Sequence, residues 1–377
     1  MRFRDLKRQY EALKQRLDEE IQSVIEEGEF IAGAKVGELE SKLAEYVGAK
    51  HCITCASGTD AIRLSLMAFK IGCGDAVFVP DFTFFATAEM PAALGAVPVF
   101  VDVLPDTYNI DPQKIEESIL KVKKEGRLRP RAVIPVDLFG QCADYGAIGE
   151  IAEKYGLTVI EDAAQSFGGK IGEKRACSFG NIAAASFFPS KPLGCYGDGG
   201  AVFTDDEKIA ALIRSYAVHG MGANKYDNER IGLNSRLDTL QAAVLLAKFD
   251  AFKEYELEKV NEAAAWYTEM LSGTVKTPSI KREHYSSWAQ YTIRTENKEQ
   301  REALRKALKE KGIPSMVYYP KGLHRQRAFE GLPLYGAFPV TDHLCETVLS
   351  LPIHPYMERN DVEEVAETIK ECLKMPN

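Results

Sequence analysis

The sequence predicts an α/β fold: a large domain whose mostly parallel sheet is covered by helices, followed by a smaller α+β domain. Short apolar runs alternate with segments of helical periodicity through the first 250 residues. Such alternation is typical of β-α-β units, whose strands are buried on both faces. From about residue 251 the pattern changes to shorter units. We therefore expect a large domain over 1–250, which includes an N-terminal helical segment, and a small domain over 251–377.

The elements follow in a regular order. Apolar residues spaced three or four apart predict an amphipathic helix over Leu6–Val24. The predicted strands are His51–Cys55, Ala76–Val79, Val97–Val101, Ala132–Val136, Leu157–Ile160, Ile182–Phe188 and Ala201–Phe203. The helices between and after them are Asp60–Phe69, Thr87–Leu94, Tyr145–Tyr155, Glu207–Val218 and Thr239–Phe252, the last continuing toward Leu271. The small domain contributes Tyr285–Arg294 and the helix Lys298–Lys311.

Composition and charge narrow the function classes. The 377 residues are 45% hydrophobic and 27% charged, and the formal net charge is −8. No overall positive field attracts nucleic acid or an anionic membrane, so we expect neither as a partner. The first twenty residues lack an apolar signal-peptide core, which predicts a cytoplasmic protein. The eight cysteines are scattered through the chain, so we expect no disulfide and no metal site.

In a parallel α/β sheet, ligands gather at the carboxyl ends of the strands. The turn Ala56–Asp60 follows the first strand, and its backbone N–H groups and hydroxyls could hold a phosphate. The same residues could simply cap the next helix. The aromatic stretch Phe82–Phe85 follows the second strand. A ring exposed there could stack on a flat heterocycle, although core packing explains it equally well.

Two further strand ends carry charged side chains. Glu161 and Asp162 end one strand, and strand alternation puts them on different faces, so we expect one of them to point into the crevice. Either acid could instead cap a helix. Lys191 lies in the apolar, glycine-rich stretch Ala185–Gly200. A lysine in such surroundings is costly unless it is paired or used covalently.

These features combine into one reaction logic. A low-dielectric site lowers the pKa of a lysine, which can then form a Schiff base with an aldehyde cofactor. A carboxylate that keeps a pyridine nitrogen protonated makes the ring an electron sink. A lysine, an acid, an aromatic ring and a phosphate turn are the set that pyridoxal 5'-phosphate needs. Their order along an α/β chain predicts this cofactor.

Eight stretches carry a resemblance to a known family: FRDLKRQY, ASGTDAI, PDFTFFATAE, VIEDAAQSFGG, SFFPSKPLGCYGDGGAVFT, GLNSRLDTLQAAVL, YYPKGLHRQ and SLPIHPYM. Over nearly its whole length the chain resembles the sugar-nucleotide aminotransferases of the DegT/DnrJ/EryC1/StrS family, which are pyridoxal-phosphate enzymes of fold type I. The SFFPSK-GDGG block and NSRLD are the most specific matches. The resemblance implies a seven-stranded sheet in the large domain.

The resemblance also implies roles for the residues around the cofactor ring. Lys191 would bind the cofactor covalently and later move a proton between substrate and cofactor carbons. Asp162 would pair with the pyridinium nitrogen, and Gln165 would hydrogen-bond the ring hydroxyl. Phe84 would stack on the ring face opposite the reacting side. Lys191 and Asp162 are therefore the expected catalytic residues.

For the phosphate, the matching positions are Gly58, Thr59 and Ser186, together with Asn234 of the partner subunit. The resemblance thus implies a homodimer with composite active sites. Three further residues match positions near the substrate in relatives: Arg236, Tyr319 and His324.

The resemblance implies L-glutamate as amino donor and a nucleotide-linked keto sugar as acceptor. Several stretches, GQCADY among them, are most similar to enzymes that aminate C3 of a UDP-linked 2-acetamido-3-keto sugar for cell-surface polysaccharide (lipopolysaccharide or O-antigen) biosynthesis. The expected acceptor is UDP-2-acetamido-2-deoxy-3-oxo-D-glucuronate or its 3-oxo-glucose analogue. Relatives acting on the uronate tend to carry His where this chain has Tyr318, which leaves that choice open.

Four other functions are the alternatives to this one. A 4-keto sugar aminotransferase would carry the same catalytic residues, and a non-catalytic cofactor or sugar-nucleotide binder could keep the same pocket. A dehydrogenase is disfavoured because no G-x-G-x-x-G follows the first strand. Dehydratases of the same family carry a histidine where this chain has Lys191.

Overall fold

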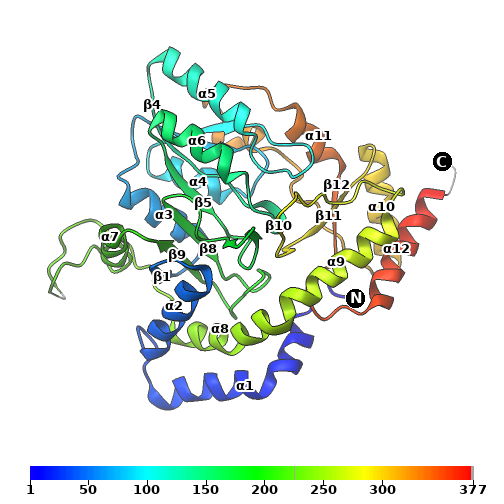
Figure 1. Ribbon diagram of the computed structural model, residues 1–377, viewed down its shortest axis with the longest axis horizontal. Coiled ribbons are helices and arrows are strands. Elements are labelled where there is room, and N and C mark those ends of the chain that lie inside the picture. The colour runs from blue at the N-terminus through cyan, green and yellow to red at the C-terminus, as the bar shows by residue number, and fades with distance from the viewer. Residues whose placement is uncertain (225, 375–377) are drawn as a thin grey trace.

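A seven-stranded sheet forms the centre of the computed structural model, which describes residues 1–224 and 226–374 (Figure 1). Its strands, in spatial order, are β1 (His51–Cys55), β9 (Gly200–Thr204), β8 (Ile182–Ser186), β5 (Thr158–Asp162), β4 (Arg129–Val133), β2 (Asp75–Pro80) and β3 (Val97–Val101). Neighbouring strands from β8 to β3 run parallel, while β9 is antiparallel to both of its neighbours. The predicted mostly parallel sheet is confirmed.

Helices cover both faces of this sheet, as predicted (Figure 1). Successive side chains of a strand enter different apolar clusters, such as Val77 and Phe78 of β2. One face packs against α3 (Gly58–Ala68), α4 (Ala86–Ala93) and α7 (Glu207–Ala217). The other packs against α2 (Ala34–Val47), α5 (Pro112–Glu125), α6 (Tyr145–Tyr155) and α8 (Thr239–Ala251), with α1 (Leu6–Glu27) lying along α8.

The strand β4 begins and ends three residues earlier than the sequence predicts. The apolar run Ala132–Val136 predicts a strand there, but β4 covers Arg129–Val133. Pro135 has no N–H to donate, so the regular ladder stops before it. Val136 instead forms an isolated bridge with Asp162.

The C-terminal part carries a small sheet of its own. Helix α8 continues through a π-helical turn, η2 (Phe252–Glu256), into α9 (Leu257–Leu271). Antiparallel β11 (Tyr291–Arg294) and β12 (Val348–Leu351) pack with α10 (Lys298–Glu310), α11 (Pro339–Thr347) and α12 (Arg359–Lys374). One apolar cluster extends from Leu39 of α2 to Ile369 of α12. The division into domains at residues 250 and 251 stays a prediction.

Several short elements complete the chain. A three-stranded sheet consists of β10 (His284–Tyr285), β6 (Lys170–Ile171) and β7 (Lys174–Arg175). The short helical turns are η1 (Leu138–Gly140), η3 (Leu323–Arg325) and η4 (Arg327–Phe329). Within residues 1–224 and 226–374, no helix has both the length and the apolar character that a membrane span needs.

Candidate active site

A cavity of about 430 Å³ opens at the carboxyl ends of β5 and β8. This is the edge of the sheet where ligands are expected in parallel α/β folds. Eight of the predicted site residues line the cavity: Gly58, Thr59, Phe84, Asp162, Gln165, Ser186, Lys191 and Tyr319. The fold therefore brings together side chains that are up to 261 positions apart in the sequence, from Gly58 to Tyr319.

Lys191 lies in a closed loop that follows β8. The Lys191 amide donates to the carbonyl of Phe188 at 2.8 Å, and the Cys195 amide donates to the carbonyl of Phe187 at 2.8 Å. These bonds place the lysine side chain in the cavity wall. Burial lowers the pKa of Lys191 to about 8, while the nearby charge of Asp162 opposes this shift. A fraction of the amine is therefore uncharged at neutral pH and able to act as a nucleophile.

Asp162 ends β5 and is only 4% exposed. It lines the cavity, whereas Glu161 lies on the other face and accepts backbone N–H groups of Cys177 (2.6 Å) and Phe179 (2.7 Å). The expectation that one of the two acids points into the crevice is confirmed. Asp162 accepts the Thr87 hydroxyl at 2.9 Å and the Ala164 N–H at 3.2 Å.

Burial raises the pKa of Asp162, and the hydrogen bonds from Thr87 and Ala164 and the charge of Lys191 oppose that rise. The two donors favour the ionised carboxylate, which can pair with a cationic ring nitrogen in the cavity. Lys191 and Asp162 thus line the same cavity from different elements of the sheet edge, and the charge of each acts on the pKa of the other.

Gln165 is held in one orientation by two neighbours. Its Oε1 accepts the backbone N–H of Phe139 at 2.7 Å, and its Nε2 donates to the Tyr319 hydroxyl at 3.1 Å. The amide therefore presents its N–H donors toward Tyr319 and the cavity. Burial raises the pKa of Tyr319, which stays a neutral phenol at neutral pH.

The two aromatic residues after β2 differ in their surroundings. Phe82 is buried in the core, whereas the ring of Phe84 is 58% exposed and lines the cavity. Both interpretations of the aromatic stretch therefore hold, each for a different ring. Phe84 is free to stack on a planar ligand.

The turn before α3 has the geometry of an anion site. Ser57 caps the helix by accepting the Asp60 N–H at 3.1 Å, and the first N–H groups of a helix have no intrahelical partner. A Cβ atom on Gly58 would lie 2.6 Å from the Cβ of Ser186. Only glycine lets the end of β8 approach this helix so closely. The residues present thus fit a phosphorylated planar cofactor, because Lys191 and Asp162 line the same cavity as this turn.

Three predicted residues do not line the cavity of this chain. Asn234 is exposed and forms an isolated bridge with Val218, and Arg236 lies two residues beyond it. His324 is bound to Asp81, through its backbone N–H at 2.7 Å and its Nδ1 at 2.6 Å. The roles of these three residues stay predictions.

Other residues of the site had no assigned role from the sequence. Asp198, Phe188, Ser190, Gln290, Tyr318 and Thr83 line the cavity. Asp198 lies in the GDGG stretch, so the motif itself was a signal for it. Gln290 comes from the segment between β10 and β11 and had no such signal. Thr87 lies in the first turn of α4, and only its contact with Asp162 reveals it.

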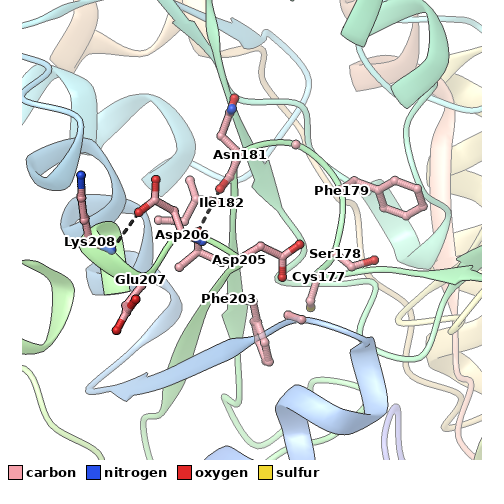
Figure 2. Close-up of a pocket in the computed structure, with 13 residues that line it drawn as sticks. Cys177, Ser178, Phe179, Asn181, Ile182, Phe203, Asp205, Asp206, Glu207 and Lys208 are labelled. Carbon is pink, nitrogen blue, oxygen red and sulfur yellow. Dashed lines mark hydrogen bonds between the residues drawn. The ribbon is translucent and has the colours of Figure 1, made fainter. Parts of the chain in front are cut away.

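A second cavity, of about 590 Å³, opens near the start of β8 and the end of β9 (Figure 2). Asp205, Asp206, Glu207 and Lys208 lie along one side of it, and Asp206 caps α7 by accepting the Lys208 N–H at 2.8 Å. This is the opposite edge of the sheet from Lys191. None of the predicted catalytic or cofactor residues lines it.

Comparison with known proteins agrees with the geometry. The family described as "DegT/DnrJ/EryC1/StrS aminotransferase family" matches residues 11–370. The chain is 46% identical over 367 residues to UDP-2-acetamido-2-deoxy-3-oxo-D-glucuronate aminotransferase of Pseudomonas aeruginosa, covering 97% of this chain and 99% of the relative.

Solved structures extend this similarity. A DegT DnrJ EryC1 StrS aminotransferase from Brucella abortus is 48% identical, with a TM-score of 0.97 and full coverage of both chains. NtdA from Bacillus subtilis, solved with bound cofactor PMP, is 30% identical with a TM-score of 0.85, over 97% of this chain and 82% of that one. The chain therefore belongs to the DegT/DnrJ/EryC1/StrS aminotransferase family and is a pyridoxal-phosphate-dependent aminotransferase.

Proposed function

We propose that this enzyme transfers the amino group of L-glutamate to C3 of a UDP-linked 2-acetamido-3-keto sugar. The expected acceptors are UDP-2-acetamido-2-deoxy-3-oxo-D-glucuronate and its uncharged 3-oxo-glucose analogue. The main support for transamination is that Lys191 and Asp162 line one cavity together with the turn before α3, whose free N–H groups suit a phosphate. The high identity to the Pseudomonas aeruginosa enzyme supports the choice of acceptor.

Each residue that lines the cavity has a separate role in the proposed reaction. Pyridoxal phosphate, when bound, supplies an electron sink for the carbon that loses its proton. Asp162 holds a negative charge at the buried end of the cavity, and Thr87 keeps that carboxylate in place. The amine of Lys191 would move a proton from the α-carbon of the amino donor to a cofactor carbon, and in the second half-reaction it would move a proton from that carbon to the acceptor carbon. Gln165 and Tyr319 fix polar groups at the cavity wall, and the exposed ring of Phe84 closes one side.

A panel of acceptors tests the substrate assignment. The purified enzyme is incubated with L-glutamate and, separately, with the UDP-linked 3-oxo-glucuronate, the UDP-linked 3-oxo-glucose analogue and a 4-keto sugar nucleotide. We expect amino sugar by mass spectrometry with the first two, and NMR to place the new nitrogen on C3. Turnover of the 4-keto sugar alone would refute the C3 assignment.

The same panel addresses the C6 carboxylate. Among the described residues that line the cavity, Lys191 is the single cation. Tyr318, which precedes Tyr319 in the sequence, also lines the cavity and carries no charge. A uronate would therefore need a cation from outside this lining. Comparing kcat/KM for the charged and uncharged acceptors measures whether such a cation is supplied.

We also propose a homodimer with composite sites, in which Asn234 of the partner subunit binds the cofactor phosphate. The exposure of Asn234 and its absence from the cavity of its own chain support this arrangement. Mixing two inactive variants tests it: Lys191→Met and Asn234→Ala subunits are unfolded together and refolded. Random pairing makes half of the dimers hybrid, and each hybrid has one intact site. We expect about a quarter of wild-type activity to return; no recovery would argue against composite sites.

The proposal also includes the location of the enzyme and the pathway that it serves. The enzyme acts in the cytoplasm, and its amino sugar product serves cell-surface polysaccharide biosynthesis. Cell fractionation tests the location, and deleting the gene in its source organism tests the pathway, since the 3-amino sugar should disappear from the surface polysaccharide. An unchanged polysaccharide would remove this part of the proposal.

A further inference from the structure

A half-buried arginine, Arg4, contacts the loop that carries Lys191. The Nη2 of Arg4 donates to the carbonyl of Lys191 at 3.0 Å and lies 3.5 Å from the carbonyl of Pro192. Arg4 comes from the segment before α1 and so reaches the loop from 187 positions away in the sequence. The side chain of Lys191 faces the cavity while its carbonyl faces Arg4. The loop is therefore fixed from the side opposite to the reacting amine.

A second cation holds the same loop. The Nζ of Lys248, on α8, donates to the carbonyl of Gly194 at 2.8 Å and lies over the ring of Tyr196 at 4.2 Å from its centroid. Lys248 is only 1% exposed. The carbonyls of residues 191, 192 and 194 thus all face donors that carry a positive charge.

The charges around Arg4 come from several elements. Glu256 of η2 is 3% exposed and faces both cations, and it also accepts the Tyr356 hydroxyl at 2.6 Å and the Gln9 amide at 2.9 Å. Burial lowers the pKa of His354 to about 4, and the charge of Arg4 acts in the same direction, so that histidine is neutral at neutral pH. Burial lowers the pKa of Arg4 to about 10, so Arg4 stays charged in the working range.

This arrangement is costly for a purely structural role. The Nη1 of Arg4 is buried and has no hydrogen-bond partner among the residues that the structure describes. An incompletely paired buried guanidinium costs stability that an apolar side chain would not. Such departures from good packing are expected where function requires them.

Arg4 also acts on the chemistry through its charge. The pKa of Lys191 is lowered first by burial, with Asp162 acting in the opposite direction and Arg4 in the same direction as burial. A positive charge behind the loop disfavours a second positive charge on the amine.

The segment before α1 also connects the site to the C-terminal elements. The carbonyl of Phe3 accepts the Ile353 N–H at 3.3 Å, and its ring meets that of Tyr318 in an edge contact with centroids 6.3 Å apart. Figure 1 shows the N-terminus beside α9 and α12. Tyr318 lines the cavity, as does Lys191. Phe3 therefore contacts one lining residue and Arg4 contacts the other.

We propose that Arg4 is a positioning residue of the transamination: it fixes the Lys191 loop through two backbone carbonyls, from the side opposite to the reacting amine. The proposal depends on no choice of sugar acceptor. Its test can therefore fail or succeed independently of the substrate assignment.

The first measurement needs no substrate. The visible absorbance of the yellow holoenzyme is recorded between about pH 6 and pH 10, and the midpoint of its change reports the protonation of the Lys191 nitrogen. In Arg4→Gln the midpoint should rise by about half a pH unit or more, because one repelling charge is removed. In Arg4→Lys the midpoint should stay within about 0.2 units of wild type, since the charge is kept.

The second measurement is steady-state kinetics. For Arg4→Gln, kcat should fall about fivefold or more while KM for the amino donor changes less than about twofold, because positioning affects the reacting group and not donor binding. Arg4→Lys should lose part of this kcat, since a flexible ammonium lacks the fixed, planar donor geometry of the guanidinium that holds the two carbonyls. The control is Arg2→Gln, an exposed arginine two positions away, which should match wild type in both measurements.

Either of two results overturns the proposal. One is a folded Arg4→Gln enzyme with the wild-type midpoint and kcat. The other applies if Arg4→Gln does not fold: an Arg4→Lys enzyme with undiminished kcat would show that the geometry of the guanidinium is not required.

Discussion

The hydroxyl of Thr87 donates to Oδ2 of Asp162 across 2.9 Å, and both side chains are almost fully buried. Thr87 belongs to the first turn of α4, whereas Asp162 ends β5, so the bond joins a covering helix to the sheet edge. A buried carboxylate needs such donors to remain ionised. The acid that we propose to face a ring cation is therefore stabilised by a residue to which the sequence assigned no role.

Replacing Thr87 by Val should weaken this support. The variant removes the donor and keeps the shape, so we expect a loss of about 1–3 kcal/mol in the free energy of unfolding. The pKa of Asp162, already raised by burial, should rise further because Thr87 opposes that rise. Activity on the acid side should then be lost at a higher pH than in wild type.

The measurement is kcat/KM against pH, together with thermal unfolding. Thr87→Ser keeps the hydroxyl and serves as the matched control. An acid limb in Thr87→Val that coincides with that of Thr87→Ser would contradict the role given to this hydrogen bond.

Lys191 and Lys248 have similarly lowered pKa values, so Lys248 serves as an internal control for the reactivity of Lys191. The pKa values of Lys191 and Lys248 are both lowered to about 8, mainly by burial. Only Lys191 lines the cavity, since the amine of Lys248 is bound to the carbonyl of Gly194. Borohydride reduction of the holoenzyme should therefore attach the phosphopyridoxyl group to the peptide that contains Lys191 and leave the peptide of Lys248 unlabelled.

Peptide mass spectrometry decides the matter in one sample. The variant Lys191→Met should lose the label and lower transamination by about a thousandfold or more. Label on Lys248, or amino-group exchange that survives in Lys191→Met, would remove the basis of the assignment.

The sequence predicted the sheet from local pattern, whereas that pattern left the acid open between Glu161 and Asp162, and the family resemblance implied the roles of Asp162 and Lys191. Buried strands appear as apolar runs, and Asp162 and Lys191 follow two of those runs. The helices α5 and α12 were not predicted, although Ile115, Ile119 and Val122 of α5 recur at helical spacing on its buried side. Their many charged residues obscured the apolar stripe.

Other parts of the site depend on tertiary contacts. Thr87 and Gln290 approach the cavity from elements separated by about 200 positions, and the sequence assigned a role to neither. His324 carries a family match, yet the structure binds it to Asp81 and stacks it on Phe338. Such placements depend on which elements pack together, and residue types in one stretch do not reveal that.

Cofactor capture by the apoenzyme should depend on pH through Lys191. Burial has lowered the pKa of this lysine from 10.5 to about 8, so the neutral amine becomes available at lower pH than for an exposed lysine. The rate of reconstitution with pyridoxal phosphate should rise from neutral pH and level off above pH 8, because only the uncharged amine is nucleophilic.

Stopped-flow absorbance at several pH values measures this rate. A rate that continues to rise toward pH 10.5 would show that Lys191 titrates as an ordinary lysine in the protein. The control is binding of pyridoxine phosphate, which lacks the aldehyde and should show no such dependence on the lysine.

Gly58 should be intolerant of even one methyl group. A Cβ at this position would lie 2.6 Å from the Cβ of Ser186 and 3.2 Å from its Cα, so either α3 or the end of β8 must move. Overpacking of this kind costs about 1–3 kcal/mol. The same displacement would disturb the N–H groups at the start of α3 that we expect to hold the phosphate, so Gly58→Ala should also bind pyridoxal phosphate at least about tenfold more weakly.

Gly37 provides the comparison, because it lies inside α2 and a methyl group added there would have no atom within 4 Å. Gly37→Ala should stabilise the protein by about 0.5–1 kcal/mol through helix propensity and leave cofactor affinity unchanged. Thermal unfolding of the two apoproteins and fluorescence titration with the cofactor separate the effects. Equal cofactor affinity in Gly58→Ala and Gly37→Ala would mean that the close contact between α3 and β8 does not shape the phosphate site.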